Sequence, residues 1–139
     1  MNLKWYYWYF KSAIPEKICD DIVSYGKEQD KQMATTGSNN KNELTEVQLK
    51  NIQKKRKSDV VWMSDRWIYN EIQPYIYQAN ESAGWNFEWD WSEPCQFTEY
   101  KKGQFYDWHC DSFGEPYDVP KNTNIHGKLR KLSMTVSLT

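Results

Sequence analysis

His109 and Asp111 are the residues whose types and spacing point most directly to chemistry. They close the stretch Gln96–Asp111, which has the pattern of two short strands around a glycine turn. Residues two apart on a strand point to the same face, so the imidazole and the carboxylate should project together. These groups are two of the three ligands in the 2-His-1-carboxylate triad that holds non-haem Fe(II). The pair therefore predicts part of a metal site, whose third ligand has to come from elsewhere.

Two alternatives stand beside this interpretation. Cys110 could supply a thiolate ligand, but strand parity turns it away from the face shared by its two neighbours. The plainer alternative takes His109 as an ordinary core or surface histidine and Asp111 as a turn residue at the end of a strand. On those two residues alone, the plainer alternative is favoured.

The N-terminal third is expected to contribute a strand and a helix. The aromatic run at residues 4–10 has strong strand propensity. Pro15 suits the first turn of a helix, and the apolar residues after it recur at helical spacing through about Gln29. Residues 30–42 have the turn-forming composition of a loop.

The middle of the chain predicts a strand at Asp59–Met63 and a helix capped by Ser64 or Asp65. Pro74 should kink or restart this helix, and Gly84 should end it. The helix should bury a stripe made of Trp67, Ile68, Ile72, Tyr75, Ile76, Ala79 and Ala83.

The last third should be mostly strand. Residues 87–91 alternate with period two, as half-buried strands do. Residues 112–127 are rich in Gly, Pro and Asn and predict a loop. Residues 130–138 are strongly strand-like, and a strand this apolar needs a partner on each side.

The composition limits the classes of function. A chain of 139 residues is long enough for one domain with a core of its own. With 18 basic and 19 acidic residues the net charge is −1, so nothing global attracts nucleic acid or an anionic membrane. The basic run Lys54–Lys57 is expected to be a solvated face. No apolar run approaches membrane-spanning length, and no signal peptide is recognised at the N-terminus.

Three cysteines at unrelated spacings argue against a zinc finger and favour a reducing, cytoplasmic setting. The high aromatic content, 17% of residues, suits an aromatic core or a contact surface.

Four segments together resemble the Fe(II)/2-oxoglutarate-dependent dioxygenases, in the branch of the prolyl 4-hydroxylase and PKHD-type hydroxylases. They are Trp85-Asn86-Phe87, Tyr100-X-X-Gly103, Tyr106-X-X-His109-X-Asp111 and the segment Arg130–Leu138. The resemblance implies an α+β fold in which helices support a double-stranded β-helix, or jelly-roll, core. Residues 1–139 would then form one domain, with helical support in 1–84 and the start of the jelly-roll core in 85–139.

The resemblance also implies roles for particular residues. His109 and Asp111 would be iron ligands, the Tyr100 hydroxyl would contact 2-oxoglutarate, and Tyr106 would line the site. Tyr100 read without the family is an ordinary half-buried strand tyrosine. The cofactors would be Fe(II), 2-oxoglutarate and O2, with ascorbate as an optional reductant. The implied reaction hydroxylates a C–H bond of a prolyl, other peptidyl or small-molecule substrate and converts 2-oxoglutarate to succinate.

The sequence departs from the family after Arg130. Relatives supply a second histidine and a basic residue for 2-oxoglutarate from later strands. His126 is the only other histidine here, and its place in the loop makes it a poor match. Ser137 stands where several relatives carry a bulky residue. We expect a C-terminally truncated oxygenase that is inactive as a fragment, the alternative being a degenerate protein.

Two other functions remain open. The first is a non-catalytic jelly-roll module that binds a protein or sugar through its aromatic surface. The second is a nucleic-acid dealkylase of the same superfamily that uses Lys54–Lys57 against phosphate.

Overall fold

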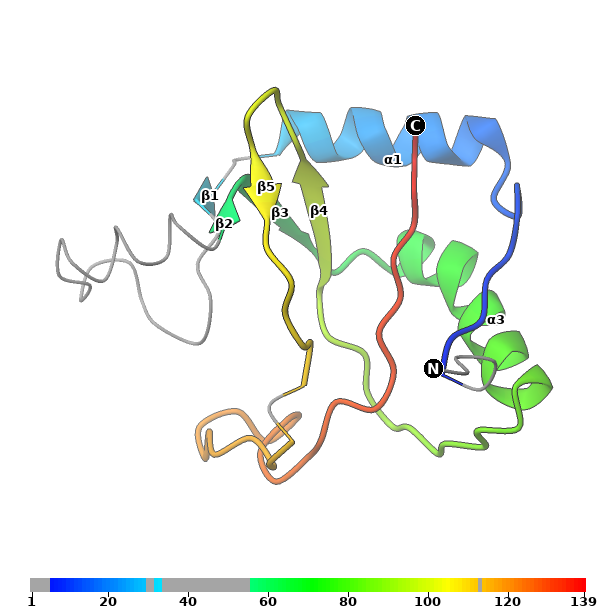
Figure 1. Ribbon diagram of the computed structural model, residues 1–139, viewed down its shortest axis with the longest axis vertical. Coiled ribbons are helices and arrows are strands. Elements are labelled where there is room, and N and C mark those ends of the chain that lie inside the picture. Colours follow the sequence, from blue (N-terminus) through cyan, green and yellow to red (C-terminus); the bar gives the residue numbers. More distant parts are fainter. Residues whose placement is uncertain (1–5, 30–31, 34–55, 113) are drawn as a thin grey trace, which may run out of the picture. The chain divides into compact units, whose positions relative to one another are not determined.

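The computed structural model describes residues 6–29, 32–33, 56–112 and 114–139 (Figure 1). In this part of the chain the fold is mixed α+β, as predicted, with two helices and small antiparallel sheets that do not close into a barrel. Of the loop expected at 30–42 only Gln32–Met33 is described, and it forms a strand, so the loop prediction is wrong at these two residues. Two of the four residues of the basic run, Lys54 and Lys55, lie outside the described residues. No helix in the described part is long and apolar enough to cross a membrane.

The chain divides into two compact units. The first contains residues 1–24, 64–93 and 110–139, and the second contains residues 25–63 and 94–109. His109 is the last residue of the second unit, whereas Asp111 belongs to the first.

The second unit is built on a pair of antiparallel strands. β3 (Asp59–Met63) and β4 (Cys95–Glu99) pair along five residues, and β1 (Gln32–Met33) adds to the other edge of β3. The predicted strand at Asp59–Met63 is confirmed. Val61 and Phe97 stand opposite each other in the ladder and are both buried, so they lie on one face of the sheet.

Helix α1 (Glu16–Glu28) brings a glycine close to that face. A Cβ placed on Gly26 would lie 2.7 Å from Cγ and Cδ1 of Phe97, closer than carbon atoms approach in proteins. Only glycine therefore allows the helix to pack so near the ring. The start of α1 follows the prediction, because the carbonyl of Pro15 accepts the N–H groups of Ile18 and Cys19.

A tight turn and a short strand complete the second unit. The N–H of Gln104 donates to the Lys101 carbonyl at 2.9 Å, and Gly103 has a φ of +80°. A type II turn requires such a φ at its third residue, so the predicted glycine turn is confirmed. The strand after it, β5 (Phe105–Tyr106), pairs with β2 (Arg56–Lys57).

The first unit is organised by helix α3 (Arg66–Ser82). Asp65 is its N-cap residue, although its side chain makes no capping hydrogen bond. The helix continues through Pro74 as one element and ends before Gly84, whose φ is +70°. Ile68 and Ala83 of the predicted stripe are buried, but Trp67 at the edge of the stripe is 37% exposed.

The predicted strand at residues 4–10 is wrong for the residues described, 6–10, which form no strand. Strand propensity needs a partner strand, and this segment contacts α3 instead. The Tyr75 hydroxyl donates to the Ala13 carbonyl at 2.6 Å, and the Tyr75 ring packs edge-on against Phe10.

The predicted strand at residues 87–91 is also wrong. The Asn80 amide of α3 accepts from the Phe87 N–H at 3.0 Å and donates to the Phe87 carbonyl at 2.8 Å. Trp89 packs on Tyr77 and donates its indole N–H to the Tyr77 hydroxyl. One helix side chain, Asn80, thus satisfies the main-chain groups of Phe87 that a neighbouring strand would have bonded.

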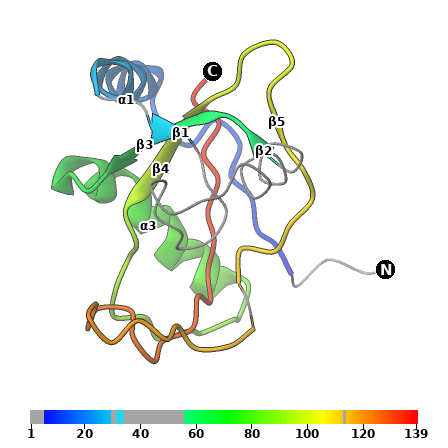
Figure 2. The same ribbon diagram turned by 90° about the vertical axis from the view of Figure 1, so that its left-hand side faces the viewer.

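The segment 130–139 is not a strand either, and no arrow marks it in Figure 1 or Figure 2. Its side chains keep most of the alternation that predicted one, since Arg130, Leu132, Val136 and Leu138 are half-buried and the odd-numbered residues are exposed, but Met134 is 38% exposed and breaks the pattern. A strand requires a paired neighbour, and no strand described here pairs with this segment.

Candidate functional site

His109 lies beyond the strand that was expected to carry it. β5 ends at Tyr106, so the prediction that His109 and Asp111 share a strand face is wrong. The ladder is short because β2, the partner of β5, matches only Phe105 and Tyr106 in the described residues. Both His109 and Asp111 are exposed.

The imidazole of His109 is oriented by two contacts within the second unit. Its ring stacks on the Tyr106 ring, with centroids 3.6 Å apart and planes 13° apart. Its Nδ1 lies 2.7 Å from the Asp107 carbonyl oxygen. A carbonyl can only accept, so this contact assigns the proton to Nδ1 and the lone pair to Nε2. A histidine that binds a metal through Nε2 uses this tautomer.

The two tyrosines of the expected site have different surroundings. Tyr106 is half-buried in β5 and supports the imidazole. Tyr100 follows the end of β4, directly before the Lys101–Gln104 turn, and is 50% exposed. The second unit thus places Tyr106 against His109 and leaves Tyr100 accessible to a small ligand.

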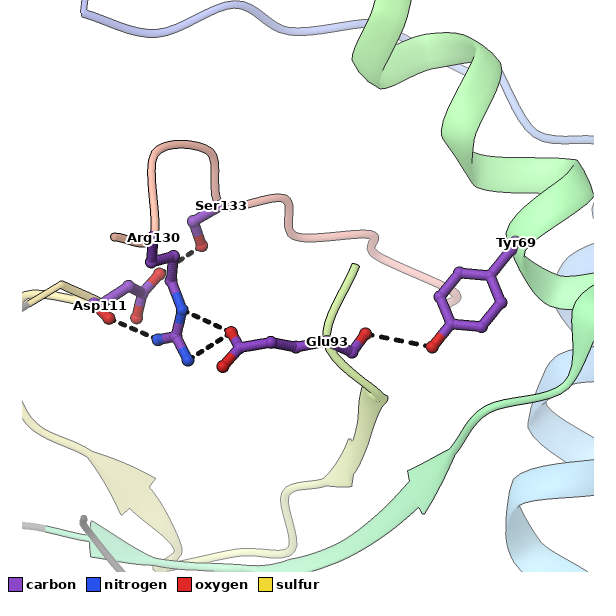
Figure 3. Close-up of polar contacts among 5 residues, drawn as sticks. All are labelled: Tyr69, Glu93, Asp111, Arg130 and Ser133. Carbon is purple, nitrogen blue, oxygen red and sulfur yellow. Dashed lines mark hydrogen bonds and ion pairs between the residues drawn. The ribbon is translucent and has the colours of Figure 1, made fainter. Parts of the chain in front are cut away.

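Asp111 is held within the first unit by the C-terminal segment (Figure 3). The Ser133 hydroxyl donates to its carboxylate, and the Arg130 guanidinium donates to its main-chain carbonyl. Both donors come from residues about twenty positions further along the chain.

Arg130 is itself held by Glu93. Its Nε and second terminal nitrogen lie 2.6 and 2.5 Å from one Glu93 carboxylate oxygen. The Glu93 carbonyl accepts from the Tyr69 hydroxyl of α3 at 3.1 Å. Figure 3 shows these residues as one chain of polar contacts from α3 to Asp111. The roles of Glu93, Ser133 and Tyr69 could not be predicted from the sequence, because no local spacing signals contacts between such distant positions.

Tyr117 lies beside this chain, and its pKa is raised above the usual 10, mainly by burial and then by the Glu93 charge, while Arg130 opposes the rise. A raised folded-state pKa favours the protonated native protein, so the linked stability falls as the pH rises from about 10 through the folded-state value. We expect Glu93→Gln to lower the Tyr117 pKa, because the variant removes the Glu93 charge that raises it. A ¹³C NMR titration of labelled tyrosines measures this. An unchanged or higher pKa in the variant would contradict it.

His126 is bound within its own loop. Its Nδ1 accepts from the Val119 N–H at 3.2 Å and lies 3.9 Å from Asp118. The loop is closed by main-chain bonds between Tyr117 and Lys128 and between Gly127 and Tyr117.

The donors fit Fe(II) in type but not in number. A nitrogen and a carboxylate oxygen, each with an orienting hydrogen bond, suit two positions of a facial triad. Only two peptide links separate the Cα atoms of His109 and Asp111. These two Cα atoms therefore lie within about 7 Å of each other however the two units are placed. Among the described residues, no three His, Cys, Asp or Glu side chains group to hold a metal.

No family model, curated protein or solved structure matches this chain.

Proposed function

We propose that this protein is an Fe(II)/2-oxoglutarate-dependent oxygenase that hydroxylates a C–H bond of a peptidyl or small-molecule substrate. The observation that carries the proposal is that both motif ligands have an orienting partner: the Asp107 carbonyl for His109 and the Ser133 hydroxyl for Asp111. Hydrogen bonds of this kind fix the tautomer and direction of metal ligands. An ordinary exposed histidine and a turn aspartate need neither.

The proposal assigns roles to this chain's own residues. His109 and Asp111 hold the metal, Tyr106 supports the imidazole, and the Tyr100 hydroxyl contacts 2-oxoglutarate. When bound, iron would supply the oxidation of the substrate with O2 and 2-oxoglutarate. The described residues supply no third ligand, so the proposal includes one from outside them.

The finer parts of the fold and setting belong to the same proposal. We assign residues 85–139 to the start of a jelly-roll core and residues 1–84 to its helical support. Cys19, Cys95 and Cys110 form no disulfide with one another, which supports a reducing, cytoplasmic setting.

The test uses the product of the complete reading frame. Fe(II) and 2-oxoglutarate are added without oxygen, and the visible charge-transfer band of the complex is recorded. We expect the wild type to show the band and His109→Ala to lose it together with turnover, because the imidazole is a metal ligand. His126→Ala is the matched control and should keep both. A band and turnover that survive His109→Ala would show that the assignment is wrong.

The exposed aromatic residues favour a second candidate, a non-catalytic binding module. Tyr6, Tyr9 and Trp108 are 80%, 74% and 100% exposed. Flat amphipathic rings of this kind suit contact with a protein or a sugar. This candidate predicts a purified protein without iron, and an Asp111→Ala variant that keeps both its fold and its partner.

A further inference from the structure

The short segment 130–133 contacts Asp111 at two different groups. Arg130 donates to the main-chain carbonyl, and Ser133 donates to the carboxylate. One contact fixes where the residue lies and the other fixes how its side chain points. Asp111 is exposed, and the Ser133 hydroxyl favours the rotamers that keep its hydrogen bond to the carboxylate.

The first contact is anchored through to helix α3. Arg130 is fixed by Glu93, and the Glu93 main chain accepts from Tyr69. The side chains of Arg130 and Glu93 are each 32% exposed, so water screens their attraction only in part. Glu93 therefore holds one side of the Arg130 guanidinium, and the other side donates to the Asp111 carbonyl, as the fork geometry of the guanidinium permits.

We propose that Ser133 is a positioning residue: its hydroxyl orients the Asp111 carboxylate, while Arg130 fixes the main chain of Asp111. The consequence for metal binding rests on the proposed function. A hydroxyl donating to an ionised carboxylate forms a charge-assisted bond, which is stronger than one between neutral groups. A ligand already turned in one direction loses less conformational freedom when the metal binds.

The alternation of the segment suits Ser133 to this role. Ser133 lies on the exposed side, whereas its neighbour Leu132 is half-buried. Loss of the Ser133 hydroxyl thus removes a polar contact without opening a cavity. Thr135 lies on the same exposed side two residues further on, so Thr135→Val is a matched removal of a hydroxyl.

The first measurement is a Co(II) titration of the full-length protein, followed through the visible absorption of the metal. Loss of an orienting hydrogen bond to a ligand typically weakens metal affinity about 10- to 100-fold. We expect a loss of about tenfold in Ser133→Ala. Ser133→Thr, which keeps a hydroxyl, should recover most of the affinity, and Thr135→Val should match the wild type. A wild type that binds no metal would count against the proposed function.

The second measurement requires no metal. Three-bond NMR couplings report whether the Asp111 side chain occupies one rotamer. We expect one rotamer in the wild type and in Ser133→Thr, and averaging in Ser133→Ala. Averaging in the wild type, or a fixed rotamer in Ser133→Ala, would overturn the positioning role whether or not metal binds. Equal Co(II) affinity in Ser133→Ala and a wild type that does bind would also overturn it.

Discussion

Gly26→Val is expected to lower the free energy of unfolding by about 3 kcal/mol, in the upper range for overpacked cores. The added Cβ would lie 2.7 Å from two ring atoms of Phe97, and the γ-methyl groups add further bulk. The ring cannot move away easily, because Phe97 is buried in the middle of the β3–β4 ladder. Gly26→Ala should lower the free energy of unfolding by a smaller amount, because alanine gains about 1 kcal/mol of helix propensity over glycine. Urea unfolding followed by circular dichroism measures both.

Ser24→Val is the matched control, because Ser24 is exposed on the same helix. The Ser24→Val variant places a β-branched residue in the helix but adds no contact to the sheet. Its free energy of unfolding should therefore change by only a few tenths of a kcal/mol. The double variant with Phe97→Leu and Gly26→Ala should recover part of the stability that Gly26→Ala loses, because it removes the ring that the added Cβ would touch. Equal stability of Gly26→Val and Ser24→Val would mean that α1 does not pack closely on Phe97.

Arg130→Met is expected to cost about 2 kcal/mol and to remove the side-chain donor to the main-chain carbonyl of Asp111. Removing one partner of a fully buried ion pair costs about 3–5 kcal/mol, and exposed pairs contribute about 0–1 kcal/mol. The Arg130–Glu93 pair lies between these cases, because each side chain is 32% exposed. Methionine keeps the length and apolar stem of arginine, so the loss reports the guanidinium contacts. The stability curve and the Asp111 couplings are measured on the same sample.

Lys128→Met provides the comparison for Arg130→Met. Lys128 also pairs with a carboxylate, Asp90, at 2.6 Å, but the Asp90 side chain is 72% exposed. The Lys128 Nζ lowers the pKa of Asp90 through a hydrogen bond. It does not belong to the chain of polar contacts that runs from α3 to Asp111. We expect little change in stability and none in the Asp111 rotamer. A loss equal to that of Arg130→Met would mean that any cation in this segment serves equally well.

The sequence predicted the elements whose signals are local. The start of α1 after Pro15, the end of α3 before Gly84 and the strand Asp59–Met63 follow from side chains within a few residues of each boundary. The turn at Gly103 belongs with them, because a positive φ is a property of a single residue. The α+β class follows from these elements together.

The failed strand predictions share a physical cause. Alternation along residues 87–91 and 130–138 describes which side chains are buried, and it does not reveal whether a second strand lies beside them. At 87–91 the main-chain partner is a single amide, Asn80, which a periodicity argument does not see. The helical glycine Gly26 was missed because its role depends on Phe97, more than seventy residues away.

In the candidate site, too, the local motif was predicted from the sequence and the contacts between distant residues were not. His109 and Asp111 were found because their motif occupies three consecutive positions. The expectation that they share a strand was wrong, because β5 ends at Tyr106. Arg130 was noted only as the first residue of the segment that resembles a family strand, and its partner Glu93 stands 37 positions earlier. Pairings at that separation are fixed by the fold, so only the structure assigns them.

The contact between Asn80 and Phe87 has a consequence for mutational tolerance. A ladder distributes its hydrogen bonds over several residues, so that no single substitution removes them all. Here one side chain satisfies both main-chain groups of Phe87. The exposed Phe87 side chain should therefore accept many replacements, while Asn80 accepts almost none, and a substitution scan of these two positions should concentrate its intolerance on the helix rather than on the residue that the helix holds.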